Sequence, residues 1–276
     1  MIDLVSDSDV EEIELIDLTA EDRDEVDSAA SPMLIAPPTA WALLAAAAAA
    51  APALRGGVKP GWTRIGGRPP PRSALDELVA RPTTLLLLLV NLGAFARLRS
   101  RDVAPSAVGL SAHALWHDRQ YARLVTSTFA HFDAMHLLFN ASSTYSLGAL
   151  EDVLGSGAYL LATLVLVPTT GLLSCALAAA ASRLDGDAAR LRTPAVGFSG
   201  VLFALVVVAT LRSPSYCVVP GVETTCFATR RVLFLRVNAA PFVLAGLVQA
   251  VVPRASFLGH LAGILLGFPA AWLLAT

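Results

Sequence analysis

Six apolar segments follow one another along the chain from residue 82 onward. They cover roughly residues 82–97, 132–150, 158–181, 195–211, 232–252 and 256–275. Most are close to the roughly 20 residues that a helix needs to cross the hydrocarbon core of a bilayer. None alternates as a strand does, and in hydrocarbon every backbone polar group needs an internal partner, which favours helices. The pattern predicts an all-α membrane protein with a bundle of six transmembrane helices over residues 82–276.

The chain before this bundle divides into two parts of different composition. Residues 1–31 hold 12 of the 22 acidic side chains and no aromatic residue. Such a segment cannot bury enough apolar surface to offset its conformational entropy, so we expect a disordered acidic tail. Residues 32–81 join an uncharged stretch rich in Ala and Pro to a basic linker. The positive-inside rule places this linker, and with it the N-terminus, in the cytosol.

The acidic tail contains a short motif, Ile13 to Thr19 (IELIDLT), which an acidic tract follows. A β-branched and leucine run of this kind can add a strand to the edge of a partner's sheet while its acids meet a basic rim. The motif resembles SUMO-interacting motifs, so SUMO or another ubiquitin-like protein is an expected partner. A solvated acidic tail is the alternative. If residues 33–54 crossed the membrane, the tail would be luminal and would not meet SUMO.

Composition supports the bilayer as the solvent of the chain. The sequence is 55% hydrophobic and 15% charged, with a mean hydropathy of +0.63, whereas soluble domains are nearer a quarter charged. Its three cysteines are too few for a disulfide framework, and their spacing matches no common zinc signature. The N-terminus shows neither a secretory signal nor a basic transit peptide, which predicts insertion through an internal apolar segment.

Inserting a polar side chain into a membrane span costs free energy, about 2.5–3.5 kcal/mol for a charge at the centre. Each polar residue in an apolar span is therefore a candidate for a functional role. The second span opens with HFDAMHLLFN, which contains His131, His136 and Asn140. His136 and Asn140 are four residues apart and therefore project from one face of a helix. They offer two adjacent hydrogen-bond donors to a single point. The alternative is that they only bridge helices by hydrogen bonds.

A serine stands at the start of the fourth span, within AVGFSGVLFAL at residues 195–205. Gly197 and Gly200 lie close to Ser199 and permit an irregular approach before a helix that we expect to begin near the serine. The backbone N–H groups of a first helical turn lack intrahelical partners and suit a developing oxyanion. Taken alone, GxSG is a weak motif, because glycine and serine also serve packing in membrane helices.

The sixth span has a single ionisable residue, His260, which Gly263 and Gly267 follow. Small residues three and four apart let a neighbouring helix come close. If that neighbour is the span of Ser199, His260 reaches the serine hydroxyl. A lone histidine near a helix end is more often an interfacial or satisfied side chain. A nucleophile, a base and paired donors on three spans nevertheless meet the requirements of acyl transfer.

Together these motifs resemble those of the rhomboid family of intramembrane serine proteases. Its members carry HxxxxHxxxN, GxSG and a histidine followed by GxxxG on their second, fourth and sixth core helices, and residues 82–276 follow this order. The strings AVGFSGVLFAL and GHLAGILLG are most similar to the eukaryotic endoplasmic-reticulum branch, the rhomboid-like-4 type. The resemblance implies a six-helix rhomboid bundle in the endoplasmic reticulum or another secretory-pathway membrane.

The resemblance also implies a role for each residue of the motifs. Ser199 is the expected nucleophile and His260 its general base. The expected oxyanion hole consists of His136, Asn140 and the backbone N–H of Ser199. Structural roles near the site fall to His131, Gly197, Gly200, Gly263, Gly267 and Arg123. The acidic position that the family has after the second span falls at Asp152, with Glu151 one residue earlier, and the sequence does not decide between them.

Cleavage of single-span membrane proteins near helix-weakening residues is the activity that the resemblance implies. It requires no metal or cofactor, and the expected partners are these substrates and the lipid bilayer, with no nucleic acid. A non-proteolytic adaptor is the alternative, but inactive relatives lack the serine or the histidine, and Ser199 and His260 are both present here. A transporter or channel predicts internal repeats or a polar pore lining, and the sequence shows neither.

Overall fold

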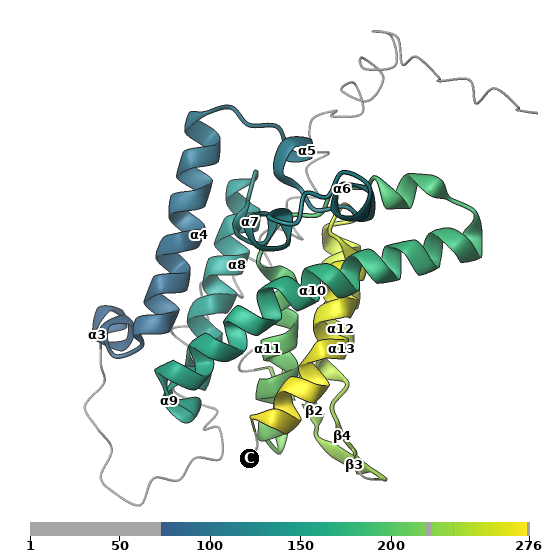
Figure 1. The fold of residues 1–276 in the computed structure, drawn as a ribbon. Coiled ribbons are helices and arrows are strands. Elements are labelled where there is room, and N and C mark those ends of the chain that lie inside the picture. Colours follow the sequence, from purple (N-terminus) through teal and green to yellow (C-terminus); the bar gives the residue numbers. More distant parts are fainter. Residues whose placement is uncertain (1–72, 219–221, 234, 275–276) are drawn as a thin grey trace, which may run out of the picture. The chain divides into compact units, whose positions relative to one another are not determined.

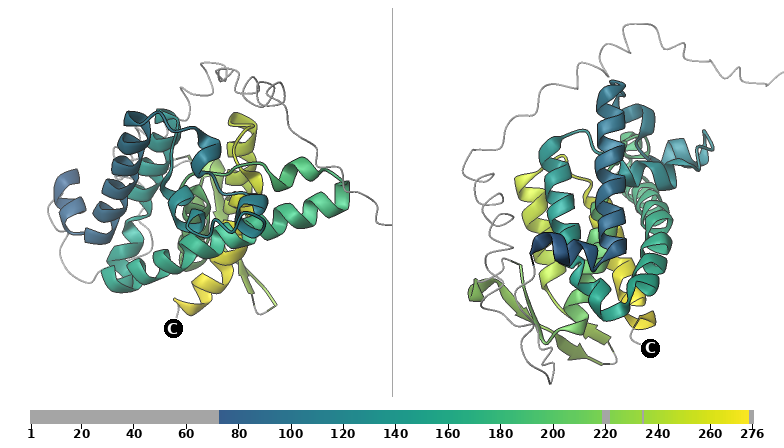
Figure 2. Two further views of the ribbon diagram at one scale, coloured as in Figure 1. Left: turned by 45° about the horizontal axis from the view of Figure 1, so that its top comes forward. Right: turned by 90° about the vertical axis from the view of Figure 1, so that its left-hand side faces the viewer.

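The computed structural model describes residues 73–218, 222–233 and 235–274. All of them belong to one compact unit of the chain. Figures 1 and 2 show that this unit is mainly helical. The acidic tail predicted over residues 1–31, its SUMO-interacting motif and most of the segment predicted over residues 32–81 lie outside the described residues.

An α-helix occupies each of the six predicted apolar segments. These helices are α4 (Pro82–Ser100), α8 (Ala134–Leu147), α10 (Ser156–Asp185), α11 (Ser199–Arg212), α12 (Ala240–Val251) and α13 (Phe257–Leu273). Among the described residues, α4 and α10 are long and apolar enough to cross a membrane, whereas α11, α12 and α13 are apolar but shorter. The helical content of the prediction is therefore present, while only two of the helices meet the length of a full span.

Helix α11 is largely buried, and its closest neighbour is α13 (Figure 1). Glycines allow this approach. A Cβ atom on Gly263 would collide with the carbonyl oxygen of Gly200, and one on Gly267 would lie 2.8 Å from the carbonyl oxygen of Ala204. The two backbones are thus in contact through small residues, which is the arrangement that the sequence predicts for these helices.

The connection between α4 and α8 folds into three short helices. These are α5 (Pro105–Val108), α6 (Ala112–Trp116) and α7 (Arg123–Phe129). Arg123 donates hydrogen bonds to the carbonyl oxygens of Ser106 and Gly109, at 2.9 and 2.6 Å, and so ties α7 to the segment around α5. Trp116 and Tyr121 in this connection are exposed, as aromatic anchors at a membrane interface would be.

Two acidic residues of α9 (Ala149–Leu154) fix the start of α4. The buried Glu151 accepts hydrogen bonds from the backbone N–H groups of Thr83 and Thr84. These N–H groups lie in the first turn of α4 and have no partner within the helix. Asp152 instead forms a two-bond ion pair with Arg81, at 3.1 and 2.6 Å. The structure therefore uses both acids, and Glu151 takes the buried position.

The prediction of an all-α fold is wrong between α11 and α12. Two small antiparallel sheets form there, from β1 (Ser215–Cys217) with β2 (Cys226–Ala228) and from β3 (Arg230–Val232) with β4 (Leu235–Val237). The sheet of β3 and β4 reaches into the first part of the span predicted over 232–252. Helix α12 begins only at Ala240, whose N–H donates to the side-chain oxygen of Asn238. A disulfide joins Cys217 to Cys226. Three widely spaced cysteines did not predict this pairing.

Three further short elements complete the described part of the chain. They are α3 (Ala74–Val79) and two 3-10 turns, η2 (Ala188–Leu191) and η3 (Glu223–Thr225). Helix α3 starts with a capping box in which Ser73 and Asp76 exchange hydrogen bonds with each other's backbone N–H. The predicted basic linker therefore ends in a helix rather than in an extended segment.

Candidate active site

Ser199 is the first residue of α11, and the segment in front of it is held from two sides. Leu110 pairs with Ala195 through two backbone hydrogen bonds of 2.9 and 2.8 Å, and Gly197 donates its N–H to the carbonyl oxygen of Ser127 in α7. Gly197 has φ +110°, a conformation that residues with a side chain rarely adopt. The chain therefore turns sharply into α11 at the serine, where the first N–H groups of the helix have no intrahelical partner.

His260 lies in the first turn of α13, and its Nε2 is 3.0 Å from Oγ of Ser199. The imidazole is 3% exposed and packs against the ring of Phe203, with 4.5 Å between the centroids. Its Nδ1 is buried and has no hydrogen-bond partner among the described residues. Packing, rather than a carboxylate, thus holds the ring in place, and the pair has the geometry of a nucleophile with its base.

His136 lies on α8 with its imidazole against the loop that precedes Ser199. A Cβ atom on Gly197 would fall 2.6 Å from Cε1 and 2.8 Å from Nε2 of His136. Asp133 caps the start of α8 by accepting a hydrogen bond from the backbone N–H of His136 at 2.9 Å. The helix therefore begins in a way that directs His136 at the serine loop.

Asn140, one turn further along α8, is buried. Its amide nitrogen donates to the carbonyl oxygen of His136 at 2.8 Å, which leaves the second amide hydrogen for another acceptor. His131 lies just before the helix, fully buried, with Nδ1 3.2 Å from the carbonyl oxygen of Phe129. The rings of His131 and His136 meet edge to face, with centroids 4.9 Å apart, so His131 supports the position of His136.

A small cavity of about 50 Å³ adjoins Ser199. Several hydroxyl groups surround it, from Ser127, Thr128, Thr170, Ser174 and Ser256 in addition to Ser199. A cavity of this size has room for a water molecule, for which the hydroxyl groups of these residues are candidate partners. Apart from Ser199, the sequence did not point to these residues, because they come from three separate segments and share no local pattern.

Most of the predicted site residues come together in the structure, whereas Arg123 does not. Ser199, His260, His136, Gly197, Gly200 and Gly263 converge where α8, α11 and α13 meet. Gly267 extends the contact of α11 with α13 by one further turn. Arg123 does not reach the pair; its hydrogen bonds within the described part of the chain go to the backbone near α5.

Apolar helices around a hydrogen-bonded serine and histidine define the class of this fold and site. A family model for the Rhomboid domain matches residues 118–276. Rhomboid-like protein 14, mitochondrial, of Arabidopsis thaliana is 34% identical over 67% of this chain and 54% of its own length. Rhomboid-related protein 4 is 34% identical in Rattus norvegicus and 32% in Homo sapiens, each over 67% of this chain and 55% of its own length.

The chain belongs to the rhomboid family. Rhomboid proteins are integral membrane proteins and are generally intramembrane serine proteases, although some members are inactive. The chain spans about half the length of the curated relatives that it matches.

Proposed function

We propose that this protein is an intramembrane serine endopeptidase that cuts single-span membrane proteins in or beside their membrane segment. The observation that carries the proposal is the 3.0 Å hydrogen bond between Nε2 of His260 and Oγ of Ser199. The oxygen of Ser199 attacks the substrate carbonyl while its proton passes to His260. The imidazolium then gives this proton to the leaving amine, and an acyl-enzyme on Ser199 remains.

We assign the stabilisation of the oxyanion to groups on α8 and at the start of α11. The N–H of Ser199 lies at the start of α11, where the helix dipole favours negative charge. His136 contributes its ring N–H from α8, and Asn140 contributes the amide hydrogen that its bond to the backbone leaves over. Substrate backbone has to be unwound at the cut, because a carbonyl in an intact helix is hydrogen-bonded and shielded, so helix-weakening residues mark the expected sites.

Hydrolysis of the acyl-enzyme needs water in an apolar surrounding. The cavity beside Ser199 has room for that water, and residues with hydroxyl groups are among those that line it. In the proposed arrangement α4, α8, α10, α11, α12 and α13 cross the membrane of the endoplasmic reticulum or another secretory compartment. The N-terminus then faces the cytosol and the Ser199 end of α11 faces the lumen.

Labelling by a fluorophosphonate probe, combined with cleavage of a co-expressed single-span substrate, tests the proposal. We expect Ser199→Ala to abolish both, and His260→Ala to lower both at least a hundredfold. Ser143→Ala, an exposed serine on α8, is the matched control and should leave both unchanged. Cleavage that persists in Ser199→Ala would exclude the proposed nucleophile. Client binding without cleavage or labelling by the wild type would favour the adaptor.

A further inference from the structure

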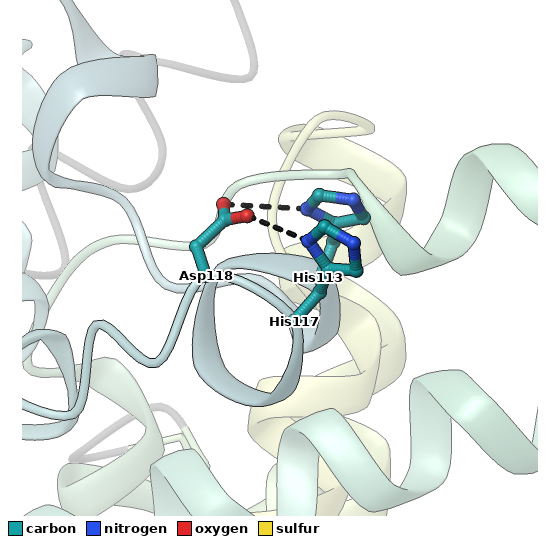
Figure 3. Close-up of side chains that lie close together, drawn as sticks. All are labelled: His113, His117 and Asp118. Carbon is teal, nitrogen blue, oxygen red and sulfur yellow. Dashed lines mark hydrogen bonds and ion pairs between the residues drawn. The ribbon is translucent and has the colours of Figure 1, made fainter. Parts of the chain in front are cut away.

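A cluster of two histidines and an aspartate lies at the end of α6, in the connection between α4 and α8. His113 and His117 are four residues apart on one helical face, and their rings stack with centroids 4.4 Å apart. Asp118 reaches both rings, with carboxylate oxygens 3.3 Å from Nδ1 of His113 and 2.9 Å from Nδ1 of His117 (Figure 3). One candidate ligand atom from each side chain lies within 4.8 Å of the others.

The contact with Asp118 determines which ring nitrogens remain free. The Asp118 carboxylate lies against the Nδ1 side of both rings. An ionised carboxylate only accepts hydrogen bonds, so the neutral rings carry their hydrogens on Nδ1 and lone pairs on Nε2. Figure 3 shows these second nitrogens on the same side of the cluster, pointing away from Asp118.

We propose that His113 and His117 bind a zinc ion through their Nε2 atoms, with Asp118 orienting both rings from behind. A carboxylate that accepts the other ring hydrogen is the usual support of a metal-binding histidine, because it fixes the tautomer and raises the basicity of the ligand. Tetrahedral zinc at about 2.0–2.1 Å from each nitrogen needs the two nitrogens about 3.3 Å apart. The stacked rings therefore have to turn so that their Nε2 lone pairs converge on the ion, and His117, whose side chain is 76% exposed, has room to turn.

The backbone that carries this cluster is already fixed. Ala112, Ala114 and Leu115 are buried beneath α6, and the carbonyl oxygen of His113 accepts hydrogen bonds from the N–H groups of His117 and Asp118. The ring nitrogens are therefore presented by an ordered turn, and binding has little backbone to immobilise.

Imidazole ligands favour zinc and neighbouring transition metals, whereas magnesium and calcium require oxygen ligands. Two positions on the ion stay open to water or to a side chain of another molecule. The inference does not depend on the proposed protease activity, because no residue of the cluster belongs to the Ser199 site.

Zinc binding to the full chain, purified in detergent without a polyhistidine tag and stripped with a chelator, tests the proposal. Titration in the presence of a competing chromophoric chelator should give a stoichiometry of one bound zinc per chain. An excess of magnesium should not displace this zinc. His113→Gln and His117→Gln should each weaken binding at least tenfold. Asp118→Asn should weaken it about 10- to 100-fold, as expected for a supporting carboxylate. Tyr121→Phe, an exposed aromatic of the same connection, is the control and should bind as the wild type does.

The double variant His113→Gln/His117→Gln separates this cluster from other metal ligands in the chain. The histidines are at least partly exposed, so the metal-free variant should unfold at the same temperature as the metal-free wild type, and zinc should raise the unfolding temperature of the wild type alone. Equal zinc affinity in the double variant and the wild type, or no zinc on the wild type, would overturn the proposal. The hydrogen bonds among these three side chains would then serve only to stabilise the end of α6.

Discussion

The carboxylate of Glu151 accepts hydrogen bonds from both the backbone N–H and the hydroxyl of Thr84, at 2.8 and 2.7 Å, although 67 residues separate them. It also accepts the N–H of Thr83 at 2.9 Å. One buried side chain of α9 thus satisfies two orphan N–H groups at the start of α4 and places negative charge at the positive end of that helix. This contact, distant from Ser199, fixes how the first long helix joins the bundle.

Replacing Glu151 with Gln should lower the free energy of unfolding by about 2–3 kcal/mol. The amide keeps one acceptor oxygen but turns an NH2 group toward donors that then lose their partner inside the fold. Unfolding in mixed detergent and SDS measures the change. Glu223→Gln, an exposed acid beside the small sheets, should shift stability by less than about 0.5 kcal/mol. Equal effects of the two substitutions would contradict the capping role.

The same carboxylate predicts a dependence of stability on pH. Burial alone would raise the pKa of Glu151, but hydrogen bonds from Ser156, Thr84 and Thr83 outweigh it and hold the pKa below its ordinary value. A carboxyl group whose pKa is lower in the folded than in the unfolded state stabilises the protein at pH values above its unfolded-state pKa, about 4.3 for Glu. This stabilisation is lost as the pH falls through the folded-state pKa. The stability difference between the wild type and Glu151→Gln should therefore be constant near pH 6 and shrink below about pH 4. A stability difference that grows as the pH falls would contradict a lowered pKa of Glu151 in the folded state.

Gly263→Ala should separate α11 from α13 and with them the serine from the histidine. The new methyl group would collide with the carbonyl oxygen of Gly200, which is backbone and cannot swing away. We expect a loss of about 1–3 kcal/mol in stability and at least a tenfold loss of probe labelling. Gly246→Ala in α12 is the matched control, because no atom lies within 4 Å of its added Cβ and alanine favours a helix. Unchanged stability and probe labelling in Gly263→Ala would show that α11 and α13 lie further apart than in this structure.

Gly197→Ala should disturb the serine loop through two separate effects. Its positive φ strains any side chain, by about 1–3 kcal/mol, and the methyl group would press on the ring of His136. Gly155→Ala also has positive φ but meets no atom within 4 Å, so it reports the strain alone. Adding His136→Ala should recover part of the stability lost in Gly197→Ala and none of that lost in Gly155→Ala. If the stability changes caused by His136→Ala and Gly197→Ala simply added in the double variant, the two residues would not be in contact.

Much of the fold and of the site was readable from sequence because the relevant signals are local. Apolar runs located six helices, and the glycines beside Ser199 placed the serine at the start of one of them. The small residues on two helix faces predicted the approach of Gly200 to Gly263, and this approach brings His260 to the serine. Where a helix face decides the contact, residue spacing is enough to predict it.

The features that sequence did not predict depend on contacts between distant segments. The bridge between Leu110 and Ala195 involves no motif, and neither partner has a distinctive side chain. The sheet of β3 and β4 reaches into a segment whose apolar composition matches a helix, and α12 begins only where Asn238 accepts the N–H of Ala240. Hydrophobicity alone does not separate a short strand from the first turns of a helix.

The disulfide between Cys217 and Cys226 provides a test of orientation. Figure 1 shows β2, β3 and β4 at the end of the bundle where α13 ends, opposite α5, α6 and α7. In the proposed orientation this end faces the cytosol and therefore the outside of sealed microsomes. A membrane-impermeant maleimide should then label Cys217 and Cys226 without permeabilisation once reductant has opened their disulfide, while the buried Cys175 stays unlabelled. Labelling that requires both permeabilisation and reductant would place this end in the lumen and reverse the orientation.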